Sequence, residues 1–96
     1  MARPIFEWDE KKNVENRRKH GISFQKAQLA FLDRRRVTAR DLAHSGREER
    51  FYCFGRITDG ILTVRYTIRR GRIRIIGAGF WRKGKKAYEE ANQIHG

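Results

Sequence analysis

Cysteine, proline and acidic side chains are scarce in this chain of 96 residues. The single cysteine, Cys53, excludes an internal disulfide and is typical of a protein in a reducing cytosol. Because it lies in an apolar run, we expect a small buried side chain and no metal site built on it. The single proline, Pro4, stiffens the chain just before the first expected strand.

Long apolar runs are absent as well. The beginning of the chain has no apolar segment of signal-peptide length, and no later stretch approaches the length of a membrane span. We therefore expect a cytoplasmic protein. The length predicts a single domain over residues 1–96 with one modest hydrophobic core.

The shortage of acids leaves a strong positive charge. The chain has 23 Lys and Arg residues against 11 Asp and Glu residues, which gives a formal net charge of +12. Such a balance attracts polyanions or an acidic partner. No stretch combines a cationic face with a wide apolar face, so nucleic acid is favoured over a membrane surface as the partner.

Caps and periodicity predict an α+β fold, with helices packed on a small antiparallel β-meander. Asp9 and Ser23 are expected to cap two N-terminal helices, and Gly21 to end the first of them. Val14 is the only aliphatic residue of the first helix, so that helix should be largely exposed. Residues 24–32 should bury Phe24, Ala27 and Phe31. Residues 33–49 should be irregular or weakly extended around Val37. A helix over residues 83–94 should turn Ala87, Glu90 and Ala91 to one face.

Three strands are predicted over residues 50–57, 61–69 and 72–78, after a short strand at residues 5–8. Turns at Asp59-Gly60 and at Arg70-Gly71 would join them. Both turns place apolar residues on one common face, with Ile57 opposite Leu62 and Ile68 opposite Ile73. A slip of one residue would turn this set outward, so we expect this face to be buried.

The opposite, polar face of the predicted meander alternates arginine with aromatic residues. Guanidinium groups bind phosphate bidentately, and exposed rings stack on bases, so the pattern favours single-stranded RNA as a ligand. An alternative is that a helix covers Tyr52 and Phe54, with the arginines at its edge. The polar face comprises Arg50, Tyr52, Phe54, Arg56, Arg65, Thr67, Arg69, Arg72 and Arg74.

Few residues outside this face suggest chemistry. His20 lies among basic residues and can either accept a proton or bond the last carbonyls of its helix. The spacing of His44 from Asp41, Glu48 and Glu49 matches no metal-ligand pattern. His95 is expected at a frayed end, and no glycine-rich nucleotide loop is present. We therefore expect no metal and no cofactor, which leaves cleavage of RNA by its own 2′-hydroxyl.

Four stretches together resemble one protein family, the BrnT-type ribonuclease toxins of bacterial type II toxin–antitoxin pairs. These stretches are "FEWDEKKNVENRRKHGISF", "DLAHSGREERFYCFGRITDG", "LTVRYTIRRGRIRIIGA" and the late "YEE", and they run through nearly the whole chain. The resemblance implies a RelE-like fold and metal-independent cleavage of RNA that arrests growth. It also implies a BrnA-like ribbon-helix-helix antitoxin, whose complex with the toxin binds operator DNA.

Individual positions match the family unevenly. The family's Lys-His-Gly corresponds to Lys19-His20-Gly21, and its central block includes His44, Ser45, Glu49, Arg50 and Phe51. Its last hairpin corresponds to Arg69, Arg72 and Arg74. The family usually continues Ser-Ala-Arg where this chain has Gly77-Ala78-Gly79, so one expected arginine is missing. If that arginine contributes to cleavage, this enzyme could be slow or inactive; alternatively, Arg82 or Lys83 could reach into the same space.

The leading hypothesis is a metal-independent endoribonuclease toxin. We expect Arg69 and Arg74 to hold the scissile phosphate and His20 to carry a proton. Further RNA contacts are expected from Arg50, Tyr52, Phe54, Arg56, Arg65, Arg72, Trp81 and Lys83. Two alternatives remain open from the sequence: a non-catalytic RNA-binding module with the same face, and a regulatory protein whose basic face binds an acidic partner.

Overall fold

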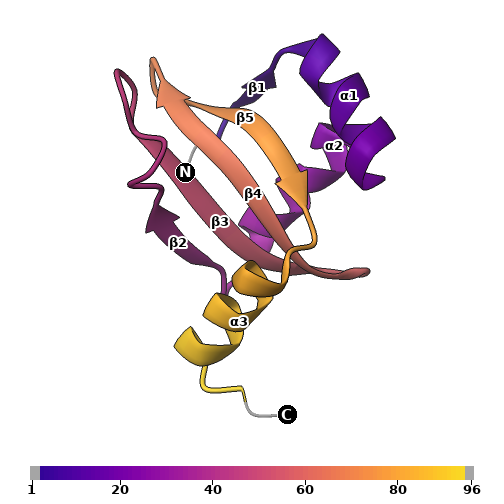
Figure 1. The fold of residues 1–96 in the computed structure, drawn as a ribbon, viewed down its shortest axis with the longest axis vertical. Helices are drawn as coiled ribbons and strands as arrows, with labels where there is room; N and C mark the ends of the chain where they lie inside the picture. Colours follow the sequence, from indigo (N-terminus) through magenta and orange to yellow (C-terminus); the bar gives the residue numbers. More distant parts are fainter. Residues whose placement is uncertain (1–2, 95–96) are drawn as a thin grey trace.

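A computed structural model describes residues 3–94, and His95 lies outside this range. Within it, the chain has the predicted α+β composition, and helices lie on both sides of the sheet (Figure 1). The elements in chain order are β1 (Phe6–Trp8), α1 (Glu10–His20), α2 (Phe24–Ala27), the 3₁₀ helix η1 (Gln28–Leu32), β2 (Val37–Arg40), β3 (Arg50–Ile57), β4 (Gly60–Arg69), β5 (Arg72–Gly79) and α3 (Arg82–Ala91).

The sheet is mixed, and the expectation of a purely antiparallel meander is wrong at one edge. The strand order is β1-β5-β4-β3-β2, and β1 runs parallel to β5 while the other neighbours are antiparallel. The backbone N–H of Ile73 donates to the carbonyl of Ile5 at 2.9 Å. This parallel pairing places Phe6 and Trp8 on the same face as Ile73 and Ile75, which gives the short strand an apolar surface to pack on.

The two hairpins fix which residues share a face. The turn at Arg70-Gly71 is confirmed, and both residues have the positive φ that a type I′ turn requires. The first turn is displaced: Ile57 pairs with Gly60, so Thr58 and Asp59 form the loop. Because the pairing differs from the expected one by two residues, every side chain keeps its predicted face.

One face of the sheet carries the main core beneath α1, α2 and η1. Cys53, Leu62 and Val64 are fully buried there against Phe24. Gly55 permits this packing, because a Cβ at that position would overlap the backbone carbonyl of Ala30. The expected stripe of the second helix therefore lies on the core, although the helix tightens from α to 3₁₀ geometry after its first turn.

Helix α1 is attached to the core by hydrogen bonds, because it has almost no apolar residues to bury. Asn16 donates to the carbonyl of Ala78 at 2.9 Å and accepts from its N–H at 3.1 Å. Asn13 accepts from the N–H of Phe24 at 2.8 Å. Val14 is 58% exposed, as predicted. These two buried asparagines fix where the end of the helix, and with it His20, lies relative to β5.

Helix α3 packs on the opposite, polar face of the sheet and buries a second cluster around Phe54, Ile61 and Tyr88. Of the predicted face of this helix, Ala87 packs on the cluster, but the prediction is wrong for Glu90 and Ala91, which are exposed while Gly84 and Tyr88 are buried. A glycine faces the sheet since any Cβ at position 84 would overlap the hydroxyl of Thr63. The helix also ends at Ala91, before the predicted residue 94.

Candidate functional site

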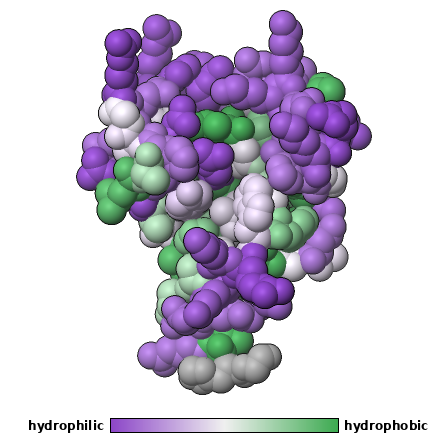
Figure 2. Space-filling view, viewed as in Figure 1, coloured by the Kyte–Doolittle hydropathy of each residue, from purple (hydrophilic) through white to green (hydrophobic). Residues whose placement is uncertain are grey.

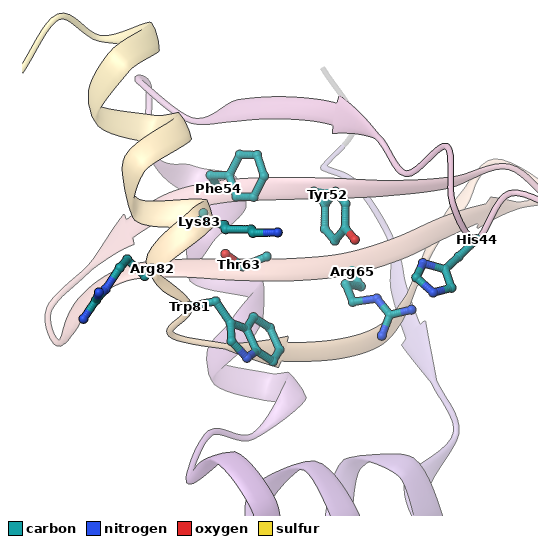
Figure 3. A pocket seen from close by; sticks show the side chains of 9 residues that line it. His44, Tyr52, Phe54, Thr63, Arg65, Trp81, Arg82 and Lys83 are labelled. Atoms are coloured by element: carbon teal, nitrogen blue, oxygen red, sulfur yellow. The ribbon is translucent and has the colours of Figure 1, made fainter.

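Helix α3 covers only part of the polar face, and a cavity of about 470 Å³ opens beside it. Figure 2 shows hydrophilic side chains over most of this view, with paler and hydrophobic side chains gathered in its middle over the sheet. Side chains from β3 and β4, from α3 and from the loops that carry His44 and Trp81 line the cavity (Figure 3). Its lining residues are His44, Tyr52, Phe54, Thr63, Arg65, Trp81, Arg82, Lys83 and Gly84.

Arg65 is the cation at the centre of this arrangement. A β-bulge between Arg65 and Tyr66 breaks the register with β5, and the cross-strand neighbour of Arg65 there is Gly77, which has no side chain. Bulges commonly redirect a side chain in this way. The Nε of Arg65 is buried and has no hydrogen-bond partner, and its guanidinium forms no ion pair with residues 3–94. A half-buried, unneutralised guanidinium is suited to an anionic ligand.

Tyr52 forms the aromatic wall of the cavity. Its ring stacks on that of Phe54, with 5.7 Å between the ring centroids. Burial, and then the nearby carboxylate of Asp41, raise the pKa of Tyr52, so its phenol stays protonated. The expectation that Phe54 is free to stack on RNA is wrong: it is only 8% exposed, because α3 covers it. The alternative of a covering helix is thus correct for Phe54, while Tyr52 remains half-buried at the helix edge.

His44 enters the cavity from the loop between β2 and β3, and a buried carboxylate holds its ring. The Nδ1 atom of His44 lies 3.0 and 3.1 Å from the two carboxylate oxygens of Asp41. Ser45 fixes this loop by donating to the carbonyl of Asp41 at 2.6 Å and accepting from the N–H of Arg50 at 3.0 Å. Burial acts to raise the pKa of Asp41, but the hydrogen bonds from His44 and Tyr52 and the attraction to His44 together outweigh it and leave the pKa below its ordinary value.

The first turn of α3 adds positive charge at the opposite end of the cavity. Lys83 points across the sheet toward Tyr52 and Arg65, whereas Arg82 points away from them (Figure 3). The first turn of α3 contains no acid, and the N-cap residue Trp81 makes no side-chain capping hydrogen bond. Cations are unfavourable at the positive end of a helix dipole. Their presence there is understandable if the site attracts an anion.

His20 lies in an adjoining groove rather than in the cavity. Its ring meets that of Trp81 edge to face, with 5.2 Å between centroids, and Trp81 separates groove from cavity. Arg65 lines both spaces. Gly79 makes room for this tryptophan, since a Cβ at position 79 would come within 2.8 Å of its ring.

The two arginines predicted to be catalytic, Arg69 and Arg74, lie outside the cavity and already have acidic partners. Arg69 binds Glu48 through two hydrogen bonds, at 2.7 and 3.0 Å. Arg74 binds Glu7 at 2.9 Å across the parallel strand pair. The structure therefore does not bring the predicted set of His20, Arg69 and Arg74 together in one cavity, and the arginine that lies near His20 is Arg65.

The remaining predicted RNA contacts are dispersed over the molecule. Arg50 is half-buried on the polar face, and Arg72 is exposed 3.8 Å from Glu7. Arg56 lies on the far side of α3, its guanidinium 5.7 Å from the centroid of the Tyr88 ring. Only Tyr52, Phe54, Arg65, Trp81 and Lys83 of the predicted contacts line the cavity.

Sequence reasoning assigned no role in the site to His44, Thr63 or Gly84. Two signals pointed to His44: its spacing of three residues from Asp41, and its match to the central block of the family. Among residues 3–94, no group of three or more His, Cys, Asp or Glu side chains could hold a metal ion. Cys53 is chemically quiet, because burial raises the pKa of its thiol to about 12.

Comparison with known proteins assigns the family. Residues 8–84 match the model of the ribonuclease toxin BrnT of type II toxin–antitoxin systems. The chain therefore belongs to the BrnT family of ribonuclease toxins, as the sequence resemblance predicted, and an antitoxin partner is implied. A comparison with curated proteins finds no match. Within the described part of the chain, no helix is both long and apolar enough to span a membrane.

Proposed function

We propose that this protein is a metal-independent endoribonuclease that cleaves single-stranded RNA at the cavity beside α3. The observation that carries the proposal is Arg65, a half-buried guanidinium with no acidic partner among residues 3–94, facing a cavity shared with Lys83 and Tyr52. Bound phosphate would satisfy this cation, and the Tyr52 and Trp81 rings would stack on the adjacent bases.

The chemistry follows from these groups. The 2′-oxygen of the RNA attacks the adjacent phosphorus while the bond from phosphorus to the 5′-oxygen breaks, which leaves a 2′,3′-cyclic phosphate. Arg65 and Lys83 stabilise the additional negative charge of the pentacoordinate transition state. His20, in the groove that Arg65 also lines, gives a proton to the leaving 5′-oxygen. Arg50, Arg69, Arg72 and Arg74 guide the RNA backbone over the rest of the polar face, outside the cavity.

The tryptophan beside Gly79 has a functional consequence in this scheme. BrnT-type toxins usually carry an arginine where this chain has Gly79, and the ring of Trp81 fills the space above that glycine. Arg65 and Lys83 would supply the positive charge instead.

We also infer that the fold is of the RelE-like kind and that residues 1–96 act as one cytoplasmic domain.

The antitoxin in this proposal is a ribbon-helix-helix protein of the BrnA kind. The net charge of +12 suits an acidic toxin-binding segment, which would cover the cationic cavity and block RNA. The resulting complex would bind operator DNA through the antitoxin.

Cleavage of a defined single-stranded RNA in excess EDTA tests the proposal. The wild-type protein should cut the RNA and leave a 2′,3′-cyclic phosphate, and a similarly purified Arg65→Ala variant should be about 100-fold less active, which excludes contaminating nuclease. Tight, salt-sensitive RNA binding without cleavage would contradict an active enzyme and favour the alternative of a non-catalytic RNA-binding module.

A further inference from the structure

We propose that His44 is the general base that takes the proton from the 2′-hydroxyl, with Asp41 as the residue that positions it. This inference rests on the proposed ribonuclease function and supplies the general base, a role that the scheme above assigns to no residue. The observations that support it are the hydrogen bond within the pair, the anchoring of its loop and the location of the imidazole beside Arg65.

The hydrogen bond determines which nitrogen of His44 is available. An ionised carboxylate can only accept hydrogen bonds, so Nδ1 of His44 carries the hydrogen that lies between it and Asp41, 3.0 Å away. In the neutral ring, Nε2 then has a free lone pair. The imidazole points into the cavity toward Arg65 (Figure 3). A neutral imidazole with a bare Nε2 is the form that can accept a proton.

The carboxylate is built into the fold, whereas the imidazole is accessible. The Asp41 side chain is 4% exposed, against 56% for His44. The N–H of Asp41 donates to the carbonyl of Arg50 at 2.7 Å, so the pair is anchored to the start of β3. A buried acceptor that orients an exposed imidazole is the arrangement by which a second residue prepares a general base.

The two proton transfers of this step fit the positions of the two histidines. The proton of the 2′-hydroxyl moves to Nε2 of His44 as the 2′-oxygen bonds to phosphorus, and the protonated His20 supplies the proton for the departing 5′-oxygen. Both imidazoles then return to their starting states by proton exchange with water. An in-line displacement needs base and acid on opposite sides of the phosphorus, and Arg65 lies between the space that holds His44 and the groove that holds His20.

The test measures single-turnover cleavage in EDTA for wild type, His44→Gln and Asp41→Asn over a range of pH. Replacing His44 should lower kcat about 100-fold or more, a usual contribution of general base catalysis, while KM stays within about twofold. Among residues 3–94, the charged and titratable groups that bond this imidazole or share its cavity are Asp41, Tyr52, Arg65, Arg82 and Lys83. Because loss of the Asp41 charge disfavours the imidazolium, Asp41→Asn should lower kcat about 10-fold and move the acidic limb of its pH profile to lower pH.

Chemical rescue separates the role of a base from a structural role. Added imidazole should restore part of the activity of His44→Ala, and it should not rescue Arg65→Ala. Thermal unfolding checks that each variant is folded. A His44→Gln enzyme with wild-type kcat and pH profile would overturn the inference while the wild-type cyclic phosphate product left the proposed function intact. An inactive wild type would overturn both.

Discussion

Two groups of arginines share one face of the sheet, and they differ in whether an acid already neutralises them. Near the turn between β4 and β5, Arg69 is bound to Glu48 and Arg74 to Glu7. Toward α3, Arg65 has no such partner within residues 3–94 and faces a cavity. Arginines on the same face therefore have two roles: those near the turn form ion pairs within the fold, and Arg65 near α3 is available to bind an anion.

This difference decides at which arginine a bound phosphate gains the most binding free energy. A phosphate that approaches Arg69 or Arg74 must compete with a carboxylate already in place, so the net gain in binding free energy is small. A phosphate at Arg65 replaces no protein contact and relieves the cost of a partly desolvated charge. If only the local density of positive charge counted, the β4–β5 turn would be the better phosphate site. Because its arginines are paired with acids, Arg65 is the better site instead.

The largest expected effect compares Arg65→Ala with Arg74→Ala, two substitutions that remove the same charge. Arg65→Ala should lower kcat/KM for RNA cleavage about 100-fold, as does loss of one donor to a transition-state oxyanion. Arg74→Ala should lower it less than about fivefold, and it should lower the free energy of unfolding by about 1 kcal/mol through loss of the pair with Glu7. Single-turnover cleavage and urea unfolding measure the two quantities.

Equal losses of activity in both variants would erase the distinction between the two groups of arginines. A larger loss in the folded Arg74→Ala variant would reinstate the original prediction that this arginine holds the scissile phosphate. Arg65→Lys sharpens the comparison, because it keeps the charge but loses the planar fork that binds two phosphate oxygens. We expect an activity between those of Arg65→Ala and wild type.

Much of the fold could be predicted from the sequence because it depends on local rules. The caps at Asp9 and Ser23, the left-handed Gly21 and the turn at Arg70-Gly71 all need only neighbouring residues. The two faces of the sheet follow from a period of two residues, which is why the displaced first turn left them unchanged.

The site was harder to predict because it depends on distant contacts. Glu7 and Arg74 are 67 residues apart in sequence, and Glu48 and Arg69 are 21 apart, so composition could not show which arginines are neutralised. The face that α3 turns to the sheet depends on the contact of Gly84 with Thr63, which no helical period reveals. Both residues of that contact line the cavity.

An intermediate effect should come from Asp33, which anchors α3 beside the cavity. Its Oδ2 accepts from the N–H of Arg56 at 2.7 Å and from the hydroxyl of Tyr88 at 2.6 Å. Burial acts to raise the pKa of Asp33, but the hydrogen bonds from Tyr88, Arg56 and Arg35 outweigh it and lower the pKa below the ordinary 3.8. Asp33→Asn should lower the free energy of unfolding by about 2 kcal/mol at pH 7. The NH₂ group of the asparagine cannot accept a hydrogen bond, so it would face at least one of these donors and leave it without a partner.

The pH dependence of stability checks the same contact. Because the pKa of Asp33 is lower in the folded state, its contribution is fully present above the unfolded value of 3.8 and is lost as pH falls through the folded value. Wild type should therefore lose more stability than Asp33→Asn on acidification below about pH 4, while the difference between them stays constant from pH 5 to about pH 7. Urea midpoints at each pH measure this, and parallel acid profiles would contradict the assignment.

The smallest expected effect is a gain of binding when a paired arginine is released. Glu48→Gln should free Arg69 and raise the affinity for single-stranded RNA about threefold at low salt. The slope of log affinity against log salt concentration should steepen by less than the amount expected for one additional phosphate contact. Glu90→Gln is the matched control, since it adds the same net charge on the exposed side of α3, where Glu90 lies 3.9 Å from Lys86. Fluorescence anisotropy at several salt concentrations measures both variants. An equal gain in both would mean that net charge alone governs affinity, and that pairing at the β4–β5 turn does not withhold Arg69 from RNA.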